Sequence, residues 1–401
     1  MSDVTAYPQL NNLELYINNL KTFSYVKDDV VGFFDKVIDT LYEGIISADE
    51  QKLIDLAFQK NLSQEQLDAF FKAWDIEAHG TETALLLSYV MKEHPQLTFN
   101  DYNAPRLSGV RNFFRFKNLE LIAHFKKVMV ELGKRGIVPM VIKGGAIKSL
   151  RPDLPRVMND IDILVKNEQE YQTALQVVRD MGYVLYEPEN GEGHSTDVHF
   201  PEKNGAFLDI HCCMDFYIDN RDELTKVFFD RAQKQNVFGC ECLVPAKEDM
   251  VFLSLFHLAK NLKQGACVEG IPYAAFDLAY LTKDDFNWQI VFDDMHLTRT
   301  QVQIYMAINF MNKVFKDKFF EEEVTIDAND IARSGFYKDV FYAKFVHEVK
   351  HRCKKLKLKQ SLHSWADFKF YLKNEMWHLV TKNAYKSALL QRLFLRFLEC
   401  K

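Results

Sequence analysis

The sequence predicts an α+β fold in which a mixed sheet core lies between an N-terminal and a C-terminal helical region. The first hundred residues show helical periodicity without strand alternation, short β-branched runs follow, and helical periodicity returns from Lys247. A chain of 401 residues also exceeds what one hydrophobic core usually spans. We therefore expect three regions: helical residues 1–110, a central α+β domain at 111–245, and helical residues 246–401 with a basic tail.

The individual elements follow from the spacing of apolar residues. Ser63 followed by Gln66 is a capping-box pattern, which predicts that a helix begins just after Ser63. The segments with helical periodicity are 28–42, 64–71, 111–133, 168–181, 252–259, 272–282, 300–316 and 384–399. The segments expected to be strands are 137–142, 160–165, 183–187, 196–200, 206–212 and 237–243.

The composition is that of an ordinary globular protein, with 48% hydrophobic and 26% charged residues. The N-terminus lacks the pattern of a secretory signal, and no apolar run approaches the roughly 20 residues needed to cross a bilayer. Seven cysteines form no framework spacing, so we expect reduced thiols and a cytoplasmic location. Cys212-Cys213 and Cys240-x-Cys242 lack the usual zinc-ligand gap, and we interpret them as buried strand residues.

The net charge of −6 is unevenly distributed along the chain. Residues 344–401 contain 14 Lys/Arg and 4 Asp/Glu, a net charge of +10, whereas the remainder carries −16. Six of the ten residues at 350–359 are Lys or Arg. This basic tail either binds an anionic partner, which makes a nucleic acid a candidate, or packs on the acidic body, and the sequence leaves both readings open.

A Gly-Gly pair follows the expected strand 137–142 at the point where a helix is expected to begin. Gly144 and Gly145 let the backbone approach a phosphate closely, and the free N–H groups at a helix start point toward anionic oxygens. Most Gly-Gly pairs are simply turns. This pair indicates a phosphate site only in combination with the acidic residues that follow it.

Asp160 and Asp162 lie at the start of the next expected strand. Side chains alternate along a strand, so we expect both carboxylates on one face while Ile161 and Ile163 face the core. Two such acids repel each other unless they are solvated or bridged by cations, and removing one would then stabilise the metal-free protein. Magnesium takes oxygen ligands, and two ions about 3.5–4 Å apart can activate a hydroxyl and stabilise a leaving pyrophosphate. Taken alone, the motif is more simply explained as a solvated strand end.

Asp209 lies among apolar residues in the expected strand 206–212. Leu208 and Ile210 can face the core while Asp209 faces the Asp-x-Asp pair, and a carboxylate in such surroundings is costly unless it is paired or metal-bound. We expect Asp209 to be the third carboxylate and to accept the proton of an acceptor hydroxyl. Its nearest rival, Asp215, follows near the end of the strand.

These features in this order resemble the nucleotidyltransferase fold of the DNA polymerase β superfamily. More narrowly, the sequence is similar to the uncharacterised bacterial nucleotidyltransferase family over about residues 30–285. The segments that carry this likeness are Gly136–Pro139, Lys143–Ala146, Arg156, Asn159–Val165, Gly182-Tyr183, His199-Phe200 and Leu208–His211.

The resemblance implies a magnesium-dependent enzyme that uses a nucleoside triphosphate such as ATP. It implies that Asp160, Asp162 and Asp209 are catalytic and bind two Mg²⁺ ions, for which Mn²⁺ is an alternative. The residues it assigns to the triphosphate are Lys143, Gly144, Gly145 and Arg156. Lys143 and Arg156 would neutralise phosphate charge. The alternative, that both are ordinary surface charges beside a turn, explains the sequence nearly as well. The segment 256–261 and Asp277 lie where such enzymes often complete the nucleotide pocket.

The expected reaction is transfer of a nucleoside monophosphate to a hydroxyl or phosphate acceptor with release of pyrophosphate. The acceptor remains open between a small molecule, a sugar, a peptide and an RNA end. The alternatives are a nucleic-acid-binding protein that uses residues 350–359, and a pseudoenzyme with the same fold that acts as an interaction module. The base of the nucleotide, the oligomeric state and the roles of His194, His199 and His211 are not predicted by the sequence.

Overall fold

The structure is a computed structural model that describes residues 46–326 with short gaps, together with residues 35, 38, 39 and 42. The residues left out between 46 and 326 are 47, 60, 75–80, 153, 155, 187–194, 202–204, 215–217, 265–269, 284, 316–319, 321–323 and 325. The chain divides into two compact units, and the one described below comprises Ile46–Lys260 and Cys267–Ile326. The expectations that lie outside the described residues are those for most of 28–42, His194, Asp215, 350–359 and 384–399. The three-region division stays a prediction.

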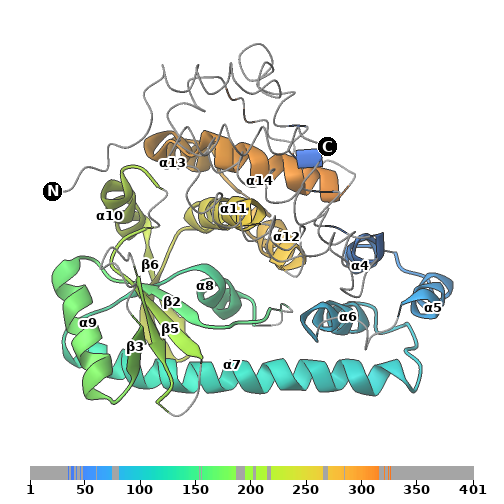
Figure 1. Cartoon of the computed structure of the whole chain (residues 1–401), viewed down its shortest axis with the longest axis horizontal. Coiled ribbons are helices and arrows are strands. Elements are labelled where there is room, and N and C mark those ends of the chain that lie inside the picture. Colours follow the sequence, from blue (N-terminus) through green and yellow to red (C-terminus); the bar gives the residue numbers. More distant parts are fainter. Residues whose placement is uncertain are drawn as a thin grey trace, which may run out of the picture. The chain divides into compact units, whose positions relative to one another are not determined.

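A seven-stranded mixed sheet is the centre of this unit, in the order β3-β4-β5-β2-β1-β7-β6 (Figure 1). The strands are β1 (Met140–Val141), β2 (Ile161–Leu164), β3 (Val184–Tyr186), β4 (Ser195–His199), β5 (Ala206–His211), β6 (Gln233–Val237) and β7 (Cys240–Val244). β2 pairs with β5 and β1 with β7 in parallel, whereas the other neighbours are antiparallel. This confirms the mixed sheet and the α+β class predicted from the sequence.

Helices precede, interleave with and follow the strands. The described helices are α4 (Ala48–Ala57), α5 (Gln64–Ala73), α6 (Thr81–Glu93), α7 (Asn103–Lys134), α8 (Lys143–Leu150), α9 (Glu168–Asp180), α10 (Arg221–Arg231), α11 (Lys247–Gln264), α12 (Gly270–Leu281), α13 (Trp288–Thr298) and α14 (Gln301–Val314). The capping box of Ser63 and Gln66 is present at the start of α5, as predicted. No helix in the described part of the chain is long and apolar enough to cross a membrane.

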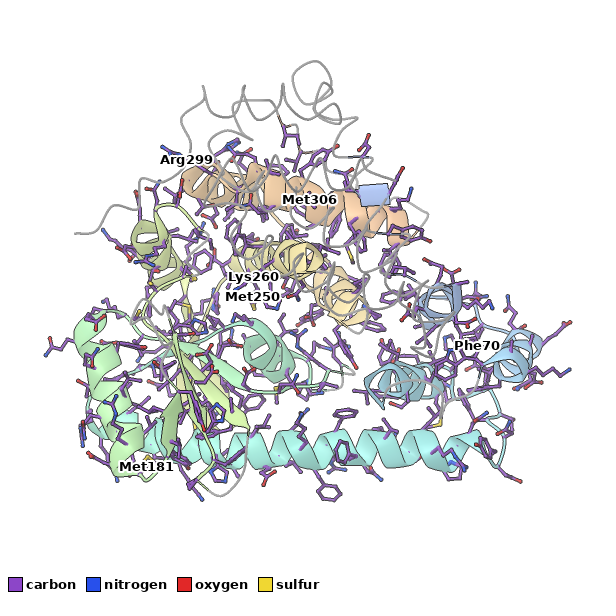
Figure 2. All side chains as sticks on the ribbon, in the orientation of Figure 1. Phe70, Met181, Met250, Lys260, Arg299 and Met306 are labelled. Atoms are coloured by element: carbon purple, nitrogen blue, oxygen red, sulfur yellow. The ribbon has the colours of Figure 1, made fainter. Side chains whose placement is uncertain are left out.

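The central strands are buried because helices pack against them. α7 and α9 contact β5, and α8 contacts β2. The hydroxyl groups of Tyr171 in α9 and Thr196 in β4 lie 2.6 Å apart, which places the Thr196 side of the sheet against α9. The side-chain sticks of Figure 2 fill the space between the sheet and these helices.

The register of the central strands aligns three carboxylates. Asp162 in β2 pairs with Asp209 in β5, and Asp209 pairs with Asp197 in β4. Paired residues on adjacent strands project to the same face, so the three aspartates form one row across the sheet. The intervening Ile161 and Ile163 project to the opposite face and are fully buried.

The expectation of one strand at 237–243 is wrong. β6 and β7 form a hairpin whose turn lies at Phe238 and Gly239, with φ of 52° and 92°. The backbone N–H of Gly239 donates to Asn236 Oδ1 over 2.8 Å, which closes the turn. Only the glycine favours this conformation, so Phe-Gly is a weaker hairpin signal in the sequence than Asn-Gly or Asp-Gly.

Candidate active site

The helix start predicted at the Gly-Gly pair is present. β1 ends at Val141 and α8 begins at Lys143, which adopts φ of 51°, a left-handed conformation that is unusual for a side chain other than glycine. The backbone N–H of Ile142 donates to the carbonyl of Asp162 over 3.0 Å and ties this turn to β2. As a result, the ammonium of Lys143 lies against the Asp162 carboxylate.

Both glycines leave space for other groups of the protein. A Cβ on Gly144 would lie 2.7 Å from Nε of Arg156, so the guanidinium occupies the surface of the turn. A Cβ on Gly145 would lie 3.0 Å from Val141 Cγ1 and 3.1 Å from Ile161 Cγ2, so this glycine lets α8 pack closely on the sheet. Close packing thus explains why glycine occupies each of these positions. The expected role of the two glycines in binding a triphosphate stays a proposal.

Asp162 is the centre of the charged cluster. Lys143 Nζ donates to its Oδ1 over 2.5 Å, and Nε2 of His211 lies 3.1 Å from the same oxygen. Burial alone would raise the pKa of Asp162, but the charge of Lys143 and the contact with His211 hold it well below its usual range. Asp162 is therefore ionised at neutral pH although it is buried.

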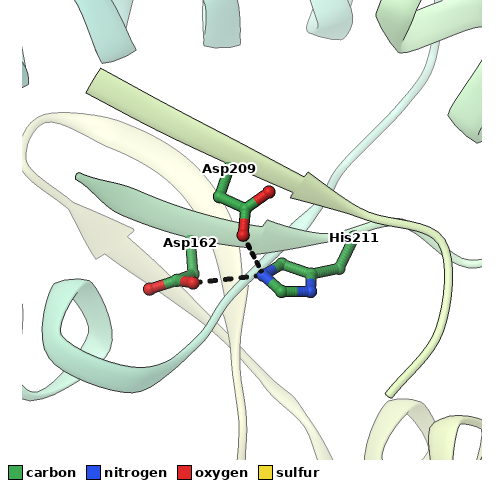
Figure 3. Close-up of side chains that lie close together, drawn as sticks. All are labelled: Asp162, Asp209 and His211. Atoms are coloured by element: carbon green, nitrogen blue, oxygen red, sulfur yellow. Dashed lines mark hydrogen bonds and ion pairs between the residues drawn. The ribbon is translucent and has the colours of Figure 1, made fainter. Parts of the chain in front are cut away.

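Asp209 lies beside Asp162 and uses only one of its oxygens. Its Oδ2 lies 3.0 Å from Nε2 of His211, while Oδ1 is buried and has no hydrogen-bond partner. Figure 3 shows this second oxygen pointing away from His211. Burial opposes ionisation of Asp209, but the charge of His211 outweighs it and lowers the pKa. An ionised oxygen buried without a partner is costly, which marks Oδ1 as a position for a bound cation or a donor.

His211 bridges the two carboxylates. Burial and the charge of Lys143 would lower its pKa, but Asp209 and the hydrogen bonds to both aspartates raise it to about 9. The ring is therefore protonated at neutral pH in the metal-free protein. Lys143 and His211 together neutralise the charges of Asp162 and Asp209, so the carboxylates do not face each other without compensation.

Asp160 stands apart from this cluster. It precedes β2 and is half-buried, whereas Asp162 lies within the strand. Burial and the charge of Asp162 raise the pKa of Asp160 to about 7. The described groups whose ligand atoms all lie within 4.8 Å of one another are Asp162, Asp209 and His211, and they do not include Asp160. A metal-binding role for Asp160 therefore stays a proposal.

The donor set fits a divalent cation. Two buried carboxylates offer the oxygen ligands that Mg²⁺ and Mn²⁺ prefer, and the unpartnered Oδ1 of Asp209 provides a free position. The imidazole of His211 can ligate only after it loses its proton. The four described cysteines lie outside this cluster; Cys213 and Cys242 are buried, whereas Cys212 and Cys240 are only partly so.

Cationic side chains lie on the α8 and α11 side of the cluster. Arg156 forms an ion pair with Asp277 in α12, and burial lowers its pKa to about 10. His257 in α11 keeps an accessible surface, yet burial and then the charge of Lys143 lower its pKa to about 4. Lys260, labelled on α11 in Figure 2, adds to the positive potential at His257. The charges of Lys143, Lys260 and Arg156 at His257 make this side of the cluster favourable for anions.

The sequence pointed to Asp160, Asp162 and Asp209 but left the role of His211 open and did not identify Asp197. His211 follows Asp209 by two residues in β5, so its presence on the same face could have been inferred from strand alternation. Asp197 became visible only through the antiparallel register of β4 and β5. His199 is half-buried, and its ring centroid lies 4.2 Å from that of Tyr186.

Replacing His211 with glutamine should remove a pH dependence from the stability of the metal-free protein. Because the pKa rises from 6.5 to about 9 on folding, the ion pairs of His211 stabilise fully below pH 6.5 and this contribution is lost as pH rises through 9. The raised pKa values of Asp160, about 7, and of Asp249, about 8, act in the same direction in both proteins. The contribution of His211 is therefore the difference between wild type and variant from pH 7 to 9.

The measurement is the melting temperature of both proteins in EDTA across that window. We expect the wild type to lose on the order of 2–3 kcal/mol more stability than the variant between pH 7 and 9. Parallel slopes for the two proteins would contradict a protonated His211.

Comparison with known proteins gives one family and several solved structures, among them the two that follow. A family model described as uncharacterised nucleotidyltransferase matches residues 76–316. The solution structure of the antibiotic-resistance factor ANT(2'')-Ia is similar with a TM-score of 0.33 and 11% identity, covering 45% of this chain and 92% of that chain. An antigenic nucleotidyltransferase-like protein from Paracoccidioides brasiliensis gives 0.31 and 14%, covering 49% and 97%. Both TM-scores are below 0.5 and add no functional argument. No curated protein matches the sequence.

Proposed function

The chain belongs to the uncharacterised nucleotidyltransferase family, and on this premise we propose that it transfers a nucleoside monophosphate from a nucleoside triphosphate, such as ATP, to an acceptor and releases pyrophosphate. The observation that carries the proposal is the buried pair of ionised carboxylates at Asp162 and Asp209, one oxygen of which has no partner. A buried carboxylate oxygen without a partner is costly, and a bound cation would satisfy it.

The metal ligands in this proposal are Asp162 and Asp209, with Asp160 as a further ligand of a second ion. Mg²⁺ is the expected ion, and Mn²⁺ suits a site that also offers an imidazole. When bound, the ions would neutralise charge on the phosphates and favour ionisation of the acceptor hydroxyl. Lys143 and His211 hold the two carboxylates ionised and in place until then.

The triphosphate would lie on the cationic side of the cluster. Lys143 and Arg156 flank the turn at Gly144, where the helix start also presents its free N–H groups. Arg156 keeps its Nε without a hydrogen-bond partner, so this buried donor is available to a phosphate oxygen. His257 and Lys260 extend the same positive region along α11, which supports a place for the outer phosphates.

The test is release of pyrophosphate from radiolabelled nucleoside triphosphates, with a small-molecule cell extract supplied as the source of acceptors. We expect release to stop after EDTA treatment and to return with Mg²⁺ or Mn²⁺, because the carboxylates cannot bind the triphosphate without a cation. Asp180→Asn, an exposed change at the end of α9, is the matched control and should behave as wild type. Release that persists in EDTA would exclude the metal-dependent mechanism.

A further inference from the structure

The row of aspartates continues beyond the metal cluster to the edge of the sheet. Asp162, Asp209 and Asp197 lie in register on β2, β5 and β4, and Asp197 is in turn paired with Tyr186 on β3. All four residues share a register position and therefore project to one face. The first two are buried, whereas Asp197 and Tyr186 are exposed.

The outer end of this row has no ion-pair partner in the part of the chain that the structure describes. Lys143 and His211 neutralise Asp162 and Asp209, but among the described residues none forms a hydrogen bond or ion pair with the carboxylate of Asp197. Like charges directly opposite each other across an antiparallel pair are destabilising. Burial and then the charge of Asp209 raise the pKa of Asp197, and these effects outweigh the opposing charges of His199 and His211.

A second observation points to a ligand at the same place. Asp209 is only 9% exposed, and its Oδ1 has no hydrogen-bond partner. This oxygen points away from His211 (Figure 3) and belongs to the residue between Asp162 and Asp197. A donor bound in front of Asp197 would therefore lie next to a buried carboxylate that keeps one oxygen without a hydrogen bond.

The two sides of the cluster differ in charge. Lys143, Arg156 and His257 make the α8 and α11 side favourable for phosphates, whereas the β4 side presents a carboxylate. In phosphoryl transfer, the attacking and leaving oxygens lie roughly in line on opposite sides of the phosphorus. With pyrophosphate leaving on the cationic side, the acceptor has to approach from the β4 side.

The edge of that face is aromatic. The side chain of Tyr186 is 56% exposed, and its ring centroid lies 4.2 Å from that of His199. Val184, paired with His199, is 43% exposed and extends the same surface. An aromatic face beside a carboxylate is a combination that binds organic cations, through the ring quadrupole and the opposite charge.

We propose that the face formed by Asp197, His199 and Tyr186 is the acceptor subsite, and that the acceptor is a hydroxyl compound carrying an ammonium or guanidinium group. This proposal rests on the proposed function. Asp197 binds the charged group and positions the hydroxyl beside Asp209. The hydroxyl oxygen bonds to the α-phosphorus, its proton passes to Asp209, and the bond to the bridging oxygen breaks with its electron pair leaving on pyrophosphate.

The same charges disfavour an acceptor that is a polyanion. A nucleic acid places a phosphate beside every sugar hydroxyl, and Asp197 would repel those phosphates rather than bind them. A neutral sugar would lose the ion pair but would not be repelled. The subsite therefore selects among the acceptor classes by charge, which makes charge the variable to test.

The experiment measures binding and labelling of matched acceptors that differ only in charge, with the full chain, a nucleoside triphosphate and Mg²⁺. The probes are glucosamine against glucose, and Lys-Ser-Lys amide against Gln-Ser-Gln amide, with a short RNA oligonucleotide as the polyanion. We expect the wild type to bind the charged member about fivefold more tightly, as for one partly exposed ion pair. Asp197→Asn should abolish that preference by raising KM while kcat changes little.

Two further variants keep the outcome interpretable. Asp197→Glu retains the charge and should retain the preference, and Asp180→Asn on α9 should leave it unchanged. Equal binding within each pair, no binding of either charged probe, labelling of the RNA, or an unchanged preference in Asp197→Asn would overturn the acceptor assignment. Metal-dependent pyrophosphate release is scored separately. Loss of that release contradicts the proposed function, whereas release that persists without any preference for charged acceptors contradicts only this inference.

Discussion

Replacing Asp162 with alanine should abolish pyrophosphate release and, at the same time, lower the stability of the metal-free protein. Activity is lost because the carboxylate is the shared ligand at the centre of the proposed metal site. Stability falls because Lys143 Nζ, 2.5 Å away, loses its ion-pair partner, while His211 Nε2, 3.1 Å away, keeps only Asp209. Removing one partner of a buried ion pair typically costs about 3–5 kcal/mol, and the remaining contact of His211 with Asp209 places this variant at or below the lower end of that range.

The measurement pairs an activity assay with thermal unfolding in EDTA at neutral pH. We expect activity to fall by more than the roughly 10–100-fold that follows loss of a group supporting a metal ligand. The melting temperature should fall clearly below that of the wild type, whereas Asp180→Asn should match the wild type in both assays. A melting temperature equal to or above that of the wild type would contradict the ion pairs seen around Asp162.

The sequence alone predicts the opposite sign for this stability change. From the pattern Asp-x-Asp, two carboxylates on one face are expected to repel, and removing one of them is expected to stabilise the metal-free protein. The structure shows why that expectation does not hold for Asp162. Its neighbours in space are Lys143, nineteen residues earlier, and His211, which is forty-nine residues later. Strand alternation specifies which face a side chain occupies but not which charges meet it there.

The parts of the site that could be predicted depend on local sequence, and the rest depends on register and packing. The turn at Gly144 and the strands of Asp162 and Asp209 follow from β-branched runs and glycine, and all three are present. The ion pair between Arg156 and Asp277 joins the loop before β2 to α12 and leaves no periodic signal. The alignment of Asp197 with Asp209 likewise depends on strand pairing, which a one-residue slip would abolish.

Replacing Asp209 with asparagine should reduce turnover severely while leaving nucleotide binding largely intact. The amide keeps the shape of the side chain but removes the negative charge and the basic oxygen. A metal ligand and the proton acceptor are thus lost together, whereas the residues proposed for the triphosphate, Lys143 and Arg156, are untouched. Asp209 is held at the centre of β5, so its carboxylate has one defined position, as a catalytic ligand requires.

The assay compares kcat with the nucleotide dissociation constant, measured separately by equilibrium dialysis. We expect kcat of Asp209→Asn to fall by at least about a hundredfold, beyond the upper end of losses at groups that only support a ligand. The dissociation constant should change much less, because the cationic side of the site is preserved. Asp215→Asn, at the position that rivals Asp209 in the sequence and lies outside the described residues, should have only a mild effect. If Asp215→Asn is the more damaging of the two, the third carboxylate is not the strand residue, and the free Oδ1 of Asp209 has no catalytic meaning.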